Sequence, residues 1–272
     1  AGNDIEQNIL RLESEGVDQQ KAYLKGIEEY AVECSITKIL GSETIQLCSD
    51  EGIQIYGGMG YSADTPMEAA YRDARIARIY EGTNEINRML LVGMILKKAM
   101  KGELDIMTPA MQVASDLMSI PSFETKDESI LLTIEKEHLQ KLKKAILMTA
   151  GKAAQHYGMD IEKEQEVLMN LADMIIDLYA AESAILRTEK LTLRNEEEQV
   201  RPQITMSKLC LYQAIKNCQQ SGKEVILSFA EGDEQKILLM GLKRFTKGYN
   251  INPKKLRREI AKKLIEENQY CF

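Results

Sequence analysis

Apolar and small side chains recur along this chain with gaps of three and four residues, the spacing of one face of an α-helix. The pattern is clearest in three stripes: Tyr23, Ile27, Tyr30, Cys34, Thr37, Gly41, Thr44 and Cys48; Leu139, Leu142, Ile146, Thr149 and Ala153; and Val167, Leu171, Met174, Leu178, Ala181 and Ile185. Alternating strand patterns are nearly absent, and the one short candidate, residues 225–229, fits a helix equally well. The sequence therefore predicts an all-α fold in which these faces pack against other helices.

The five prolines are expected where helices begin or break. Thr65 can cap a helix with Pro66 in its first position, and Glu68 would complete a capping box. Asn252 and Pro253 give a similar start signal near the end of the chain. Pro109, Pro121 and small polar residues interrupt residues 102–128, which favours a boundary there. We predict three parts: a helical domain over 1–105, a linker over 106–128 and a second helical bundle over 129–272.

Composition narrows the class of protein. The 272 residues are 44% hydrophobic and 28% charged, the balance of a globular protein, and the net charge is −7. An acidic chain is a poor general binder of nucleic acid, because phosphate binding requires a positive surface. The five scattered cysteines predict free, mostly buried thiols in a reducing compartment. With no visible export signal and no apolar run of about 18 residues, no membrane span is expected. We predict the bacterial cytoplasm, or the mitochondrial matrix if a targeting peptide has been lost.

Three glycines, Gly57, Gly58 and Gly60, predict a tight bend between two helical stretches. Glycine there permits a positive φ and lets a ligand approach the backbone closely, although an ordinary interhelical turn has the same composition. The bend is neither a dinucleotide fingerprint nor a phosphate-binding loop, because no strand precedes it and no Gly-Lys-Ser/Thr follows. His138 and His156 are the only histidines, and no metal-ligand spacing or hydrolytic triad surrounds them.

Glu81 is the candidate for acid–base chemistry. It lies just ahead of Gly82 and Thr83, and Thr83 is a natural cap for the following helix. The positive end of the helix dipole favours a charged carboxylate at this position, whereas burial beside a ligand would favour the neutral form. Opposing influences of this kind tune a general base. Composition alone would equally explain Glu81 as an acidic residue at a helix start.

Three linked motifs resemble those of acyl-CoA dehydrogenases. They are residues 54–61 (Gln-Ile-Tyr-Gly-Gly-Met-Gly-Tyr), 71–75 (Tyr-Arg-Asp-Ala-Arg) and 80–86 (Tyr-Glu-Gly-Thr-Asn-Glu-Ile), and their spacing matches as well. The resemblance implies FAD as cofactor and the four-helix-bundle-like carboxy-terminal domain of that family.

In that family, the glutamate of the Glu-Gly-Thr motif removes the α-proton of a fatty acyl thioester while the β-hydrogen leaves as hydride to flavin N5. The resemblance thus implies that Glu81 is the catalytic base and that Gly82 lies beside the acyl-CoA. It implies FAD contacts for Gln54, Ile55, Tyr56, Gly57, Gly58, Thr83, Asn84 and Glu85. The first five commonly contact the flavin of a partner subunit. Arg72, Asp73 and Arg75 either bind ligand phosphates or, as we prefer, form salt bridges that hold the glycine-rich bend against the next helix.

The chain continues for about 170 residues beyond the helix that follows Glu81, and residues 163–180 resemble, more loosely, the domain appended to very-long-chain acyl-CoA dehydrogenases. That resemblance implies a homodimer, oxidation of long-chain acyl-CoA in fatty acid β-oxidation, and electron-transfer flavoprotein as acceptor. If the protein contacts a membrane peripherally, a basic cluster near the end of the chain is the expected contact surface. We prefer the interpretation that this cluster is a solvated basic face. The cluster is Lys254, Lys255, Arg257, Arg258, Lys262 and Lys263. Residues 104–120, rich in methionine, are a comparable candidate for contact with lipid or with the fatty chain, although methionine-rich stripes more often belong to the core.

Members of the family also carry an amino-terminal helical domain and a middle β-domain, and nothing here matches either. We therefore expect a fragment that neither retains FAD tightly nor turns over substrate alone. A non-catalytic assembly protein on the same fold is the alternative function, and the intact Glu81-Gly82-Thr83 triplet favours the enzyme.

Overall fold

The computed structural model describes residues 2–106, 108–110, 112–113 and 131–272, and none of these residues forms a β-strand. The chain divides into two compact units, residues 1–103 and 104–272. The all-α prediction is confirmed. Most of the expected linker, with Met107, Met111, Leu117 and Met118 of the methionine-rich segment, lies outside the described residues.

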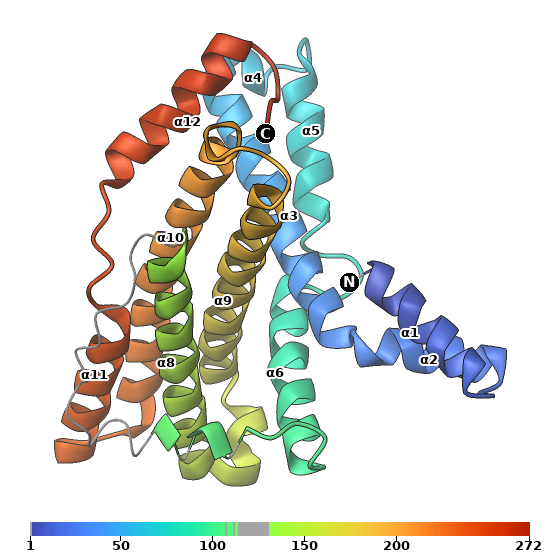
Figure 1. The fold of residues 1–272 in the computed structure, drawn as a ribbon, viewed down its shortest axis with the longest axis vertical. Helices are drawn as coiled ribbons and strands as arrows, with labels where there is room; N and C mark the ends of the chain where they lie inside the picture. Colours follow the sequence, from blue (N-terminus) through green and yellow to red (C-terminus); the bar gives the residue numbers. More distant parts are fainter. Residues whose placement is uncertain (1, 107, 111, 114–130) are drawn as a thin grey trace. The chain divides into compact units, whose positions relative to one another are not determined.

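The first unit contains six described helices (Figure 1). They are α1 (Gly2–Ser14), α2 (Gln19–Glu29), α3 (Ala31–Tyr56), α4 (Gly58–Tyr61), α5 (Pro66–Ile76) and α6 (Asn84–Met100). The long helix α3 packs against both α5 and α6 and thereby organises the unit. Ile36, Ile39 and Leu91 are almost completely buried between these elements.

The first predicted apolar stripe is wrong in its orientation. A break at Tyr30 divides it between α2 and α3, and most of its members on α3 are exposed. The buried face of α3 consists instead of Ser35, Ile36, Ile39, Ser42 and Ser49. These serines tolerate burial because each hydroxyl donates a hydrogen bond to a carbonyl oxygen of the preceding turn.

The second unit is a bundle of long helices (Figure 1). It contains α8 (Thr133–Tyr157), the 3₁₀ helix η1 (Gly158–Lys163), α9 (Gln165–Thr192), α10 (Glu197–Phe229), α11 (Gly232–Thr246) and α12 (Pro253–Glu267). The stripes predicted for residues 139–153 and 167–185 do face the core: every member is buried except Leu178, which is half-buried. Residues 225–229 belong to α10, and Pro202 lies inside the same helix rather than at its start.

Of the two helix starts predicted from capping residues and proline, one forms the expected side-chain cap and the other does not. The Asn252 side chain accepts a hydrogen bond from the Lys255 N–H at 3.1 Å and starts α12 as predicted. The capping box at Thr65 does not form, because the Thr65 hydroxyl donates to the Met59 carbonyl at 2.7 Å. Glu68 instead pairs with Arg72, one turn further along α5. Arg72 therefore has a partner in its own helix and does not bridge the glycine-rich bend.

Each of the five cysteines is a free thiol, as predicted, but only Cys218 is buried. Burial raises the pKa of the Cys218 thiol to about 12, and the charge of Asp177 acts in the same direction. The described helices contain no segment long and apolar enough to cross a membrane.

Candidate functional site

The loop between α5 and α6 adopts a backbone that few residues accept. Glu81 has φ of 56° and Gly82 has φ of 78°, so two consecutive residues are left-handed. A left-handed conformation costs a non-glycine residue roughly 1–2 kcal/mol. The surrounding residues must therefore hold Glu81 in this conformation.

The start of α6 fixes one end of the loop. Thr83 caps the helix, as predicted, because its Oγ1 accepts a hydrogen bond from the Ile86 N–H at 3.2 Å. The Asn84 N–H also donates to the Arg78 carbonyl at 3.1 Å.

Asn87 binds the loop backbone from inside α6. Its Nδ2 lies 3.4 Å from the Glu81 carbonyl oxygen, 2.9 Å from that of Gly82 and 3.1 Å from that of Thr83. A Cβ on Gly82 would approach the same Nδ2 to 3.0 Å. Both the positive φ and this close approach favour glycine at position 82.

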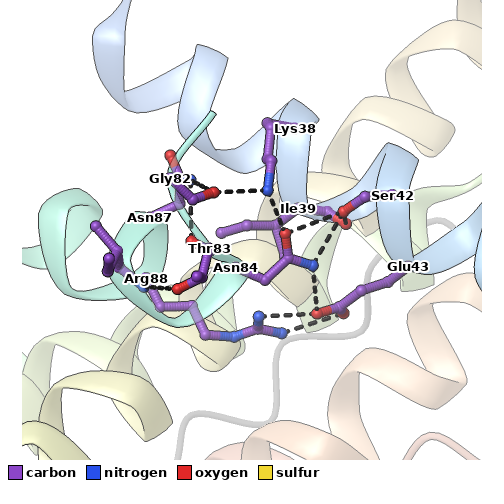
Figure 2. Close-up of polar contacts among 10 residues, drawn as sticks. Lys38, Ile39, Ser42, Glu43, Gly82, Thr83, Asn84, Asn87 and Arg88 are labelled. Atoms are coloured by element: carbon purple, nitrogen blue, oxygen red, sulfur yellow. Dashed lines mark hydrogen bonds and ion pairs between the residues drawn. The ribbon is translucent and has the colours of Figure 1, made fainter. Parts of the chain in front are cut away.

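Lys38 of α3 binds the loop from the opposite element. Its Nζ donates to the Gly82 carbonyl at 2.8 Å and to Asn84 Oδ1 at 2.7 Å (Figure 2). Asn84 has no exposed surface, and its Nδ2 donates to Ser42 Oγ at 3.0 Å and to Glu43 Oε1 at 3.1 Å. The side chain of Asn84 thus joins the loop to α3.

An ion pair completes the network. The guanidinium of Arg88 donates to Glu43 through two parallel hydrogen bonds of 2.8 and 3.1 Å (Figure 2). The Arg88 side chain is 11% exposed, and such bidentate, partly buried pairs are stronger than ordinary surface pairs. The pair therefore ties α6 to α3 directly beneath the loop.

The sequence analysis predicted Glu81, Gly82, Thr83 and Asn84 as site residues. It did not predict the side chains that fix the loop containing them. The missed residues are Lys38, Ser42, Glu43, Asn87 and Arg88. A signal was present, because the polar residues Lys38 and Ser42 on α3, and Asn84 and Arg88 on α6, recur one helical turn apart.

Glu81 itself is exposed, as is Glu85 in the first turn of α6. The pKa of the Glu85 carboxyl is lowered, chiefly because its own backbone N–H donates to it. Burial opposes this lowering of the pKa, and the Thr83 hydroxyl and the charges of Arg78 and Arg88 add to it. Glu85 is consequently an ionised acceptor at neutral pH.

The other predicted site residues lie at the end of α3 and the start of α4, where Gln54, Ile55, Tyr56, Gly57 and Gly58 are all exposed. Ile55 is 80% exposed, which is unusual for an isoleucine. Gly57 has φ of 61° and ψ of −144°, a combination almost confined to glycine. A Cβ on Gly57 or Gly58 would meet no atom within 4 Å, so this backbone is open to a ligand or partner. Groups of three or more metal-ligating side chains are absent from the described residues.

Comparison with known proteins gives the family. Two family models, both described as "Acyl-CoA dehydrogenase, C-terminal domain", match residues 17–96 and 141–244. A "Probable acyl-CoA dehydrogenase" of Bacillus subtilis (strain 168) is 38% identical over 266 residues, which are 98% of this chain and 44% of the relative. The chain belongs to the acyl-CoA dehydrogenase family.

A solved structure gives the same result for the fold. The "Crystal Structure of Acyl-CoA Dehydrogenase complexed with FAD from Bacillus anthracis" matches with a TM-score of 0.93 and 39% identity. The match covers 99% of this chain and 46% of that chain. This chain thus spans less than half of the length of these two relatives.

Mammalian members of the family match over different lengths. The mitochondrial short-chain specific acyl-CoA dehydrogenase of Homo sapiens is 42% identical over 80 residues, 29% of this chain and 18% of the relative. The mitochondrial very long-chain specific acyl-CoA dehydrogenase of Bos taurus is 30% identical over 210 residues, 68% of this chain and 32% of the relative.

Proposed function

We propose that this chain supplies the catalytic base and part of the cofactor site of an FAD-dependent acyl-CoA dehydrogenase. Glu81 would remove the α-proton of a long-chain acyl-CoA. FAD, when bound, would take the β-hydrogen with its electron pair, so that a trans-2 double bond remains in the enoyl-CoA. Gly82, without a side chain, leaves room for the thioester beside the base.

The geometry of the Glu81–Gly82 loop is the observation that best supports this proposal. Two left-handed residues are bound by donors from two helices, yet the Glu81 side chain itself is exposed. Rigid support beneath an accessible carboxylate is what a general base requires, because proton abstraction depends on its exact distance from the carbon acid.

The exposed residues fit a flavin cofactor. The amino terminus of α6, with the Thr83 hydroxyl, offers polar groups of the kind that suit a phosphate. The ionised carboxylate of Glu85 can accept hydrogen bonds from hydroxyl groups of the cofactor. The Gln54–Gly58 segment offers an amide, two apolar side chains and an open backbone. Asn84 has no exposed surface, so in this proposal it positions the loop and does not contact FAD.

Long-chain preference is the finer part of the proposal. Similarity to the Bos taurus very-long-chain relative extends over 68% of the chain, whereas similarity to the human short-chain relative covers 29%. The longer match supports a kinship that includes the second unit. As in the expectation from sequence, the proposed assembly is a homodimer that passes electrons to electron-transfer flavoprotein, with peripheral membrane contact at the basic helix α12.

The test uses the complete parent protein loaded with FAD. Anaerobic bleaching of the flavin absorbance would be followed with acyl-CoAs of increasing length, for the wild type and for Glu81→Gln. The amide cannot accept the proton, so we expect the bleaching rate to fall by at least about 100-fold. Glu28→Gln, which neutralises another exposed carboxylate in the same unit, should leave the rate unchanged.

Other outcomes would redirect the proposal. Bleaching that survives in Glu81→Gln would move the base to another residue. A preference for short acyl chains would contradict the long-chain assignment alone. No bleaching at any length, despite bound FAD, would favour the non-catalytic assembly protein.

A further inference from the structure

Three consecutive carbonyl groups, of Glu81, Gly82 and Thr83, converge on a single side-chain nitrogen, Asn87 Nδ2. Carbonyl oxygens brought together in this way repel one another unless donors satisfy them. The Gly82 oxygen receives a second donor, the ammonium of Lys38, at 2.8 Å. The left-handed turn therefore depends on two donors from two different helices.

The ammonium of Lys38 binds neutral oxygens rather than a carboxylate. In the part of the chain that the structure describes, its ammonium contacts two neutral oxygens, of Gly82 and of the Asn84 side chain, and the nearby carboxylate of Glu43 is taken by Arg88. By contrast, Lys98 of the same unit pairs with the carboxylate of Glu29. The charge of Lys38 is instead directed at the loop backbone.

The position of Lys38 is itself fixed. Asn84 Oδ1 accepts from Lys38 at 2.7 Å, while Asn84 Nδ2 donates to Ser42 Oγ and to Glu43 Oε1. Glu43 is held in turn by the two hydrogen bonds from Arg88. The ammonium thus has a defined place from which to bind the Gly82 carbonyl (Figure 2).

We infer that Lys38 and Asn87 are positioning residues for the base: by binding the carbonyls of the Glu81–Thr83 loop, they hold Glu81 left-handed and set the place of its carboxylate. This inference rests on the proposed function of Glu81. In this role both residues act on the base through the backbone carbonyls of residues 81–83.

The experiment compares Lys38→Met with Lys98→Met in the complete FAD-loaded parent. Lys98 is a matched control, because its ammonium also binds a backbone carbonyl and a side-chain oxygen across two helices, at 3.2 Å each, but away from the loop. Lys38→Met should slow flavin bleaching by about 10- to 100-fold, because a small displacement of a base has an effect of that size. FAD content and the acyl-CoA dissociation constant should change by less than about 2-fold, since the binding groups are retained. The control should match the wild type throughout.

Two further readouts separate positioning from general damage. Amide hydrogen exchange in residues 81–87 should accelerate in Lys38→Met, with or without FAD, and stay unchanged in Lys98→Met. An α-deuterated acyl-CoA should show a larger isotope effect on bleaching in Lys38→Met, because proton removal becomes more difficult. Asn87→Asp, which replaces the donor by an acceptor of the same shape, should slow bleaching more than Lys38→Met does.

The possible failures are distinguishable. An unchanged rate in Lys38→Met, with a large loss in Glu81→Gln, would overturn this inference and leave the proposed function intact. An unchanged rate in both would overturn the proposed function and the inference together. Loss of FAD or of thermal stability in Lys38→Met, without faster exchange in the loop, would make Lys38 a structural residue and also overturn the inference.

Discussion

Glu135 of α8 brings a carboxylate into the interior of the second unit, where it is 5% exposed. The Tyr249 hydroxyl donates to Glu135 Oε1 at 3.0 Å, and Lys208 Nζ lies 3.8 Å from the same oxygen. Burial, with the charge of Glu135, raises the pKa of Tyr249, so the phenol remains a donor. His138 packs beside Tyr249 with ring centroids 5.0 Å apart, and its Nδ1 has no hydrogen-bond partner among the described residues.

His138 should make stability depend on pH. Burial, followed by the charge of Lys141, lowers the pKa of His138 to about 4, against the opposing charges of Glu137 and Glu135. The unfolded chain, with a histidine pKa near 6.5, therefore binds a proton before the folded chain does, and stability is lost as pH falls from about 6.5 towards 4. Between about pH 7.5 and pH 5, the free energy of unfolding should fall by about 2 kcal/mol more in the wild type than in His138→Gln.

Urea titrations of the chain at the two pH values measure this difference. The quantity compared is the change in the free energy of unfolding between the two pH values. Any constant loss of stability caused by the substitution itself therefore cancels. His156→Gln is the control, because it replaces the other histidine of the same helix, which is exposed. Equal pH dependence in the wild type and His138→Gln would contradict the assigned pKa.

At the scale of elements, the contact between α3 and α4 depends on Gly60. A Cβ there would lie 2.6 Å from the Ile53 carbonyl oxygen and 2.9 Å from Tyr56 Cβ, so Gly60→Ala must push α4 away from the end of α3. We expect a loss of about 1–3 kcal/mol in the free energy of unfolding, the usual effect of overpacking. Gly41→Ala, inside α3 with nothing within 4 Å of the added Cβ, should instead stabilise by about 0.5–1 kcal/mol. Urea titration of both variants shows whether the free energy of unfolding falls or rises. The same change in both variants would contradict the prediction and would show that α4 shifts easily to accommodate the added methyl group.

Helical periodicity predicted the second unit better than the first, for a physical reason. Apart from Glu135 and His138 near the start of α8, the buried positions on α8 and α9 are apolar or small, so the apolar stripe and the buried face largely coincide. On α3 the buried face contains Ser35, Ser42 and Ser49, whose hydroxyls bond to their own helix. A stripe defined by hydrophobicity cannot find such a face.

The candidate site was predictable as a motif but not as a structure. Thr83 acts as the cap that its position before α6 indicates. The left-handed φ of Glu81 could not be read from sequence, because it depends on Lys38, 43 positions earlier, and on Asn87. Contacts between residues far apart along the chain leave no local pattern, which is also why Glu43 and Arg88 were missed.

At the scale of the whole molecule, the two units correspond to two family models, one over residues 17–96 and the other over 141–244. The first unit exposes large apolar side chains around its glycine-rich bend: Ile55, Tyr56, Met59 and Tyr61 are each more than half exposed. Apolar groups gathered in this way usually mark a binding surface. Because the relatives are more than twice as long as this chain, we expect the rest of the parent, a partner subunit or FAD to cover this surface.

Residues 1–272 by themselves should therefore neither retain FAD nor oxidise acyl-CoA. In the first unit, a shallow hollow is lined by Gln19, Gln20, Tyr23 and Leu24 of α2, and the proposed FAD contacts at residues 54–58 and at Glu85 lie on exposed surface. A flavin resting on exposed groups alone would remain largely hydrated and bind weakly, since tight sites bury most of their ligand. The purified chain, incubated with excess FAD and passed through a desalting column, should be colourless and inactive with long-chain acyl-CoA. The complete parent, treated identically, should remain yellow and active. A yellow, active 272-residue chain would contradict the expectation and would mean that these helices build the flavin site without the rest of the parent.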